Sequence, residues 1–204
     1  MTTRNAQVYL VRHGEAEGAT GRAIGHTDLP LSPAGLAASR ALGATAHDIP
    51  QATVVTSPLL RARATAELVA AGIGVASDDI ALEPRLREMH FGEWEGRRWD
   101  DIQREDTARC DAFMAAWTEC RTPGGEGYPD LLTRVEAWVS SQDRPTGDLV
   151  VVAHAGSIRA LLSHWLELPV RTTFQFRLDH AHVTALSVGA HVAELLYLNA
   201  DRFR

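Results

Sequence analysis

The hydrophobic pattern of the chain is dominated by short, continuous apolar runs. Three of them, at 7–11, 53–56 and 149–153, are rich in β-branched residues and lack the polar alternation of a half-exposed strand. Continuous apolar strands are typical of a parallel sheet with both faces covered. The segments that follow them are predicted to be helical, namely 32–47, 57–71 and 157–166. Strands that alternate with helices in this way indicate an α/β fold.

Local signals mark the ends of two of these helices. Ser32-Pro33 and Ser57-Pro58 each combine a preferred N-cap residue with a proline in the first turn, so we expect a helix to begin at each pair. Gly72 and Gly74 are predicted to end the second helix, because glycine readily adopts the left-handed conformation that closes a helix.

The alternation is interrupted between about 98 and 145, where segments 100–120 and 131–139 are predicted to be helical. We expect this stretch to be a helical insertion over the carboxyl ends of the strands. Three β-like runs follow, with Gly189-Ala190 as a hairpin turn between the last two; they lie at 172–178, 183–188 and 192–198. The predicted architecture is a three-layer sandwich with a mostly parallel central sheet and an antiparallel edge, formed as a single domain over residues 1–204.

Composition narrows the possible functions. A chain of 204 residues buries a core without a metal or a disulfide, and Cys110 and Cys120 lack the CxxC spacing of a zinc or redox pair. The net charge of −6 argues against a nucleic-acid partner. All twenty basic residues are arginine, which excludes a P-loop and a lysine Schiff base. The first residues contain no apolar run of the length of a signal peptide or a spanning helix, so we expect a cytoplasmic protein without a membrane partner.

Histidine and arginine follow three of the predicted strands. Arg12-His13-Gly14-Glu15 comes after the first, Ser57-Pro58 and then Arg61 after the second, and His154-Ala155-Gly156 after the strand at 149–153. Ligands of open α/β sheets bind beyond the carboxyl ends of the strands, so we expect these side chains to meet at one edge. Two guanidinium groups and nearby helix N-termini are typical of an anion site. Phosphate is the expected anion, and sulfate or a carboxylate would also fit.

A histidine beside a bound phosphate can also act as a nucleophile. A neutral imidazole nitrogen attacks phosphorus and forms a phosphohistidine, provided that the other ring nitrogen donates a hydrogen bond. Arg12, Arg61 and a protonated His154 would stabilise the phosphoryl oxygens. A carboxylic acid would protonate the leaving oxygen and later activate water. The residues alone leave four candidates for this acid: Glu83, Glu88, Glu93 and Glu95.

A further histidine pair, His180 and His182, would share one face of a strand. No carboxylate or cysteine accompanies the pair at a matching position, so packing at an edge strand is favoured over a metal site. We expect no metal.

Five ordered motifs carry a family resemblance. In chain order they are Arg12-His13-Gly14-Glu15, the segment 25–35, Ser57-Pro58-Leu59-Leu60-Arg61-Ala62, Leu86-Arg87-Glu88 with Phe91-Gly92-Glu93-Trp94-Glu95-Gly96, and the segment 152–159. With these motifs the chain resembles the histidine phosphatase superfamily, in the branch named for cofactor-dependent phosphoglycerate mutase. The resemblance covers about residues 7 to 160 and implies an enzyme that hydrolyses small phosphate esters without a metal or an organic cofactor.

The resemblance also implies roles for single residues. His13 would be the phosphorylated nucleophile and Glu88 the proton donor and acceptor, while Arg12, Arg61 and His154 would bind the phosphoryl group. We expect Ala155 to contact the phosphate as well, and Gly25 and His26 to contact the rest of the substrate. A homodimer is a further expectation.

Some positions depart from the family pattern. Ala16 stands where threonine or serine is frequent, Ala19 where an asparagine often contacts phosphate, and Gly125-Glu126-Gly127 where Gly-Glu-Ser is usual. One phosphate contact is therefore expected to differ.

Three functions remain to be separated. The Phe-Gly-x-Trp-Glu-Gly run resembles the phosphatases of the family, and the Thr-Asp-Leu-Pro-Leu segment is most similar to those that act on α-ribazole 5′-phosphate. A mutase would instead return the phosphoryl group to a bound sugar acid. A catalytically silent phosphate-binding protein is the third reading, and the retained His13, Glu88 and His154 argue against it.

Overall fold

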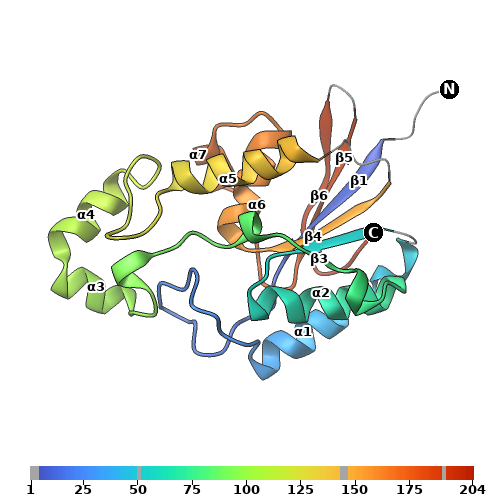
Figure 1. The fold of residues 1–204 in the computed structure, drawn as a ribbon, viewed down its shortest axis with the longest axis horizontal. Helices are drawn as coiled ribbons and strands as arrows, with labels where there is room; N and C mark the ends of the chain where they lie inside the picture. Colours follow the sequence, from blue (N-terminus) through green and yellow to red (C-terminus); the bar gives the residue numbers. More distant parts are fainter. Residues whose placement is uncertain (1–4, 50–51, 143–146, 190–191) are drawn as a thin grey trace.

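The computed structural model describes residues 5–49, 52–142, 147–189 and 192–204 (Figure 1). These residues form the strands β1 (Ala6–Arg12), β2 (Thr53–Thr56), β3 (Ala81–Leu82), β4 (Leu149–Ala153), β5 (Val183–Val188) and β6 (Ala193–Ala200). The α-helices are α1 (Pro33–Gly43), α2 (Leu60–Ile73), α3 (Trp99–Glu105), α4 (Thr107–Ala115), α5 (Tyr128–Ser141), α6 (Ala155–Trp165) and α7 (Val170–Thr173).

All of these strands belong to one sheet with the order β3-β2-β4-β1-β5-β6. The first four run parallel, β5 runs antiparallel to β1, and β6 runs antiparallel to β5. The predicted mostly parallel sheet with an antiparallel edge is therefore confirmed. The β5–β6 pairing also agrees with the predicted hairpin, although its turn residue Ala190 lies outside the described residues.

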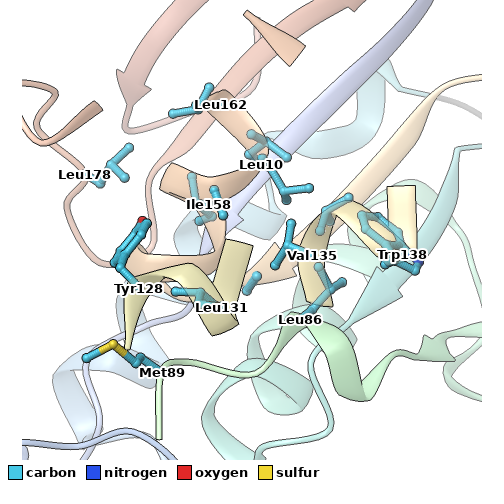
Figure 2. Packing of buried hydrophobic residues seen from close by; sticks show 14 of the residues in the cluster. Leu10, Leu86, Met89, Tyr128, Leu131, Val135, Trp138, Ile158, Leu162 and Leu178 are labelled. Atoms are coloured by element: carbon cyan, nitrogen blue, oxygen red, sulfur yellow. The ribbon is translucent and has the colours of Figure 1, made fainter. Parts of the chain in front are cut away.

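Successive residues of the central strands enter two separate cores. Leu10 of β1 and Val151 of β4 face the core formed with α5 and α6, whereas their neighbours Val11 and Val150 face the core formed with α1 and α2. Helical layers thus cover both faces, which confirms the three-layer α/β sandwich and explains why the strands are apolar throughout. Figure 2 shows the first core, in which α5 supplies Leu131, Val135 and Trp138.

The helical stretch between 98 and 145 divides into two parts. Helices α3 and α4 lie at one end of the molecule, on the left of Figure 1, beyond the carboxyl ends of the parallel strands. Helix α5 packs against α6 over one face of the sheet. The expected insertion therefore covers the strand ends with α3 and α4 only, because α5 carries an apolar face that is buried in the core.

The predicted ends of the first two helices need correction. Helix α1 ends at Gly43 rather than near His47, and α2 begins at Leu60 rather than at Ser57-Pro58. Gly72 lies inside α2, where a Cβ would come within 1.9 Å of the Gly43 carbonyl oxygen, so its role is to let the two helices touch. Gly74, with φ at 77°, ends the helix as predicted.

Two later predictions are also wrong. The segment 100–120 is not one helix, because Asp106 leaves the helical conformation and its carboxylate accepts hydrogen bonds from Trp94 Nε1 and Arg109 Nε. The segment 172–178 is not a strand: it contains the end of α7 and a turn. Arg159 donates to the carbonyl oxygens of Thr173 and Phe176, which a sheet would otherwise use.

Among the described residues, no helix combines the length and apolarity needed to cross a bilayer.

Candidate active site

The order of the sheet brings three strand ends together. Strand β4 lies between β2 and β1, and Arg12 pairs with Ala153 at the end of the β1–β4 ladder. The backbone N–H of His13 donates to Ala153 O at 3.0 Å, and that of Ser57 donates to Val152 O at 3.1 Å. His13 and His154 consequently face each other with their ring centroids 4.8 Å apart.

The hydrogen bonds of His13 define its protonation. Its Nδ1 lies 2.6 Å from the carbonyl oxygen of Gly14, which can only accept, so Nδ1 carries the hydrogen. Arg61 Nε donates to His13 Nε2 at 3.3 Å, so Nε2 presents a lone pair. Gly14 makes this arrangement possible, because a Cβ there would meet the Gly35 carbonyl oxygen at 2.5 Å. The ring is thus held as the tautomer with a nucleophilic Nε2.

Burial and charge keep His13 neutral. Burial lowers its pKa well below the usual value, and the nearby Arg61 and Arg12 cations lower it further, against the smaller opposing effect of the Gly14 hydrogen bond. A neutral imidazole at physiological pH is the form required for attack on phosphorus.

Arg61 is fixed by a loop from far away in the chain. Its Nη1 donates to Thr27 O at 2.9 Å and its Nη2 to Gly25 O at 2.7 Å, which leaves Nε directed at His13. The side chain is only 1% exposed, so this orientation is enforced by packing as well as by hydrogen bonds.

The carboxylate of Glu95 holds that loop in place. It accepts hydrogen bonds from the backbone N–H groups of Gly25, His26, Thr27 and Phe91 and from the Thr27 hydroxyl. Burial alone would raise the pKa of Glu95, but these hydrogen bonds outweigh it and leave the pKa below its usual range. Glu95 is therefore a fixed anion that organises the loop, not a proton donor.

Two buried nitrogen atoms beside His13 have no hydrogen-bond partner among the described residues. They are Arg12 Nε and His154 Nδ1. The rest of each side chain is anchored: Arg12 Nη1 donates to Leu178 O at 2.6 Å, and His154 Nε2 lies 2.8 Å from Ser57 Oγ. In the tautomer in which His154 Nε2 accepts from the Ser57 hydroxyl, Nδ1 carries the hydrogen and is a donor like Arg12 Nε. An unpaired buried donor costs about 1–3 kcal/mol, so each atom favours an acceptor.

Ser57 thus serves a different purpose from the predicted helix cap. Its hydroxyl fixes the ring of His154. The first turn of α2 instead receives Asp28 Oδ1, which accepts from the backbone N–H of Leu60 at 2.6 Å.

His154 also differs from expectation in its charge. Burial lowers its pKa well below the usual value, and His13 and Arg61 lower it further, so His154 is neutral in the free protein. A phosphate dianion placed against Nδ1 would raise this pKa again by direct attraction.

Glu88 lies beside the N-terminus of α6. Its Oε2 accepts from the backbone N–H of Gly156 at 3.1 Å, and a Cβ on Gly156 would come within 2.1 Å of Oε1. Its negative charge raises the pKa of Arg12 and of Arg61, against the larger lowering effect of burial on each. Glu88 is therefore close to Arg12 and Arg61.

The other three candidate acids are engaged elsewhere. Glu83 binds Arg85, Glu93 is exposed and binds Arg109, and Glu95 holds the loop described above. Glu88 is the one of the four that also lines a cavity next to Ala155 and Gly156.

The remaining expected substrate residues lie at the edge of the site. Gly25 contributes its carbonyl oxygen to Arg61, and Ala155 is the first residue of α6. His26 Nε2 lies 2.9 Å from the carbonyl oxygen of Glu88, so its ring bridges the loop to the Glu88 segment. Ala16, one of the departures from the family pattern, is buried.

His180 is a site neighbour that sequence reasoning missed. It lies in a turn before β5, where Ala181 adopts φ at 52° and donates to the carbonyl oxygens of Arg12 and His13. This turn places the His180 ring 5.4 Å from that of His13. The predicted packing of His180 and His182 on an edge strand is wrong, because the strand begins only at Val183. The signal that places His180 is the sheet order, which is not visible in the sequence.

Comparison with known proteins adds an independent line of evidence to this geometry. The model of the histidine phosphatase superfamily (branch 1) matches residues 8–201. The chain belongs to this superfamily. The resemblance stated from the five motifs is therefore confirmed, and it extends over β5 and β6 as well.

Individual relatives agree with this membership. The adenosylcobalamin/alpha-ribazole phosphatase of Salmonella typhimurium is 32% identical over 197 residues, covering 95% of this chain and 96% of the relative. The probable phosphoglycerate mutase GpmB of Salmonella paratyphi C is 32% identical over 183 residues, covering 88% and 84%. The crystal structure of the alpha-ribazole phosphatase from Shigella flexneri superposes with a TM-score of 0.86 at 27% identity, covering 97% and 98%. The chain is a phosphatase that acts on a small phosphorylated metabolite, as the strand-end motifs predict.

Proposed function

We propose that the protein hydrolyses phosphate monoesters without a metal ion, through a phosphohistidine formed on His13. The observation that carries this proposal is the arrangement of three atoms: the lone pair of His13 Nε2 and the unpartnered donors Arg12 Nε and His154 Nδ1. A phosphoryl group between them satisfies both donors and presents phosphorus to the nucleophile.

The first chemical step follows from these positions. His13 Nε2 attacks phosphorus, so a P–N bond forms while the bond from phosphorus to the ester oxygen breaks. Arg12, Arg61 and His154 stabilise the negative charge on the transferring oxygens. Glu88, as a carboxylic acid, gives its proton to the departing oxygen.

The second step regenerates the protein. Glu88, now a carboxylate, takes a proton from a water molecule whose oxygen attacks phosphorus. The P–N bond breaks, its electron pair returns to Nε2, and inorganic phosphate leaves. The guanidinium groups supply the positive charge that a metal ion supplies in other phosphatases. No group of three potential metal ligands from histidine, cysteine, aspartate and glutamate gathers in the described part of the chain.

The proposed substrate is α-ribazole 5′-phosphate. Support comes from the two relatives whose names state this activity, which match nearly the whole length of the chain. The runner-up is phosphoglycerate mutase activity, favoured by the similarity to GpmB. The two differ in where the phosphoryl group goes, because a mutase returns it to a bound sugar acid instead of to water.

The mechanism is tested with an aryl phosphate in excess chelator. We expect the wild type to keep its activity after chelation and to yield a labelled phosphoenzyme upon acid quenching. We expect His13→Ala to lose activity by a factor on the order of 10³ or more and to give no labelled protein. Loss of activity upon chelation, or a fully active His13→Ala, contradicts the mechanism. Phosphate binding without turnover of any ester would restore the silent binding protein.

The substrate is tested separately. We expect release of inorganic phosphate from α-ribazole 5′-phosphate and no isomerisation of phosphoglycerate. Isomerisation without phosphate release would identify a mutase.

A further inference from the structure

A cavity of about 330 Å³ lies next to Glu88 and the N-terminus of α6. This volume falls within the range of about 300–1,000 Å³ that is usual for small-molecule sites. Its wall includes Glu88, Ala155 and Gly156, so it is continuous with the position from which the ester oxygen departs.

The rest of the wall is mainly aromatic. Six rings from four separate parts of the chain line it: Phe91, Trp99, Phe113, Trp117, Tyr128 and Phe174. Trp117 and Phe174 lie with their ring centroids 4.0 Å apart, and Tyr128 meets each of them at 5.5 and 5.4 Å. The rings thus support one another and form a preformed apolar surface.

The polar groups of the wall are already used. The hydroxyl of Tyr128 donates to Gly156 O at 2.9 Å, and Arg159 Nη1 donates to two backbone carbonyl oxygens. The guanidinium of Arg159 also lies 4.6 Å from the centre of the Phe174 ring.

We propose that this cavity binds the organic half of the substrate and selects phosphate esters whose alcohol carries a flat, apolar aromatic ring. The inference rests on the proposed function, because it assumes that the ester oxygen departs toward Glu88. It adds the part of the structure that recognises the leaving group, which the proposed mechanism and substrate do not specify.

The test compares esters that differ only in the group that fills the cavity. Ethyl, 2-phenylethyl and 2-(2-naphthyl)ethyl phosphates break the same kind of primary alkyl ester bond, so general-acid demand is similar along the series. We expect kcat/KM to rise about 10- to 100-fold from ethyl to naphthylethyl phosphate, as burial of an aromatic ring predicts. Glycerol 3-phosphate, which is of similar reactivity but polar, should not share the increase.

Substitutions in the wall then locate the effect. In Phe174→Ala and Trp117→Ala, the ratio of kcat/KM for naphthylethyl over ethyl phosphate should fall at least about fivefold, mainly through KM. Trp117→Phe should restore most of the ratio. Leu196→Ala, an equally exposed apolar side chain on β6, should leave the ratio within about twofold.

The outcomes separate the two proposals. Equal kcat/KM for all three esters, in a protein that hydrolyses them, overturns the aromatic specificity but leaves the phosphohistidine mechanism standing. No phosphate release from any ester overturns the proposed function itself. The wild-type series decides the question even if the cavity variants fold poorly.

Discussion

Single atoms decide what the centre of the site accepts. Arg12 Nε and His154 Nδ1 are buried donors with no partner among the described residues, in a protein whose other buried polar side chains are satisfied there. Each unpaired donor costs about 1–3 kcal/mol of folding free energy unless an acceptor reaches it. The protein is therefore less stable when no acceptor is bound in the site. Binding of the proposed phosphoryl group would therefore remove this cost.

Glu88 gives the sharpest prediction for a single side chain. Glu88→Gln keeps the shape and one of the two acceptors that serve the backbone N–H groups of Met89 and Gly156, but cannot donate a proton to the leaving oxygen. We expect the rate of phosphoenzyme formation from an alkyl phosphate to fall by about 10²–10⁴. The rate from 4-nitrophenyl phosphate should fall much less, because its leaving group needs little protonation. Rapid-quench measurements of that step provide the comparison.

The matched control is Glu93→Gln, since Glu93 is exposed and binds Arg109 on the surface. It should behave like the wild type. An equal loss for both esters in Glu88→Gln would show that Glu88 is not the acid.

At the level of elements, α5 positions the segment that carries Glu88. Arg134 of α5 donates to the carbonyl oxygens of Arg85, Arg87 and Glu88 at 2.6–2.8 Å, and its Nε binds Glu126 at 2.9 Å. A helix that belongs to the core thereby fixes the backbone of the proposed acid and of the residues just before it.

Arg134→Met should loosen that segment. We expect a loss of about 2–4 kcal/mol in the free energy of unfolding, because several carbonyls and Glu126 lose a charged partner. We also expect kcat to drop about tenfold or more. As for Glu88→Gln, the drop should be greater for alkyl than for aryl esters, because alkyl leaving groups depend more on a general acid. Urea unfolding and the two-ester comparison measure these effects. Arg121→Met, which removes an exposed partner of Asp130, is the control, and an unchanged ester ratio in Arg134→Met would contradict the positioning role.

Helices and strands were predictable where the sequence pattern of a segment agrees with its place in the tertiary structure. The apolar runs of β1, β2 and β4 are buried on both faces, so hydrophobicity alone identifies them. Errors arose where a residue serves a distant contact: Gly72 allows two helices to touch, Asp106 accepts from Trp94, and the 172–178 turn is held by Arg159. These partners lie too far away in the sequence to be part of the helix or strand pattern of the segment they affect.

At the scale of the whole molecule, the same limit applies to the site. The residues directly after the strands were predictable, because parallel strands deliver their ends to one edge. His180 was not, since its place beside His13 depends on β5 pairing antiparallel with β1. The aromatic cavity depends on α3, α4 and α7 reaching the same point, which only the tertiary structure shows.

Three histidines gathered at one edge of the sheet also make stability depend on pH. Burial lowers the pKa of His13 and His154 well below the usual value. Burial, and then Arg12, lower the pKa of His180 to about 4, against smaller raising effects of Glu15 and Asp179. The folded protein therefore stays neutral at these positions under conditions in which the unfolded chain, with pKa values near 6.5, takes up protons.

The sign of the effect follows from this difference in bound protons. Between pH 7 and 5 the unfolded state binds more protons, so the free energy of unfolding falls as the pH falls, by about 1 kcal/mol per pH unit for each histidine that stays neutral. Urea unfolding at pH 7, 6 and 5 measures the slope, above the range in which the carboxylates protonate. His180→Asn should make the slope shallower, because it removes one of the three buried neutral imidazoles. Equal stability at pH 7 and 5 would contradict the buried neutral cluster.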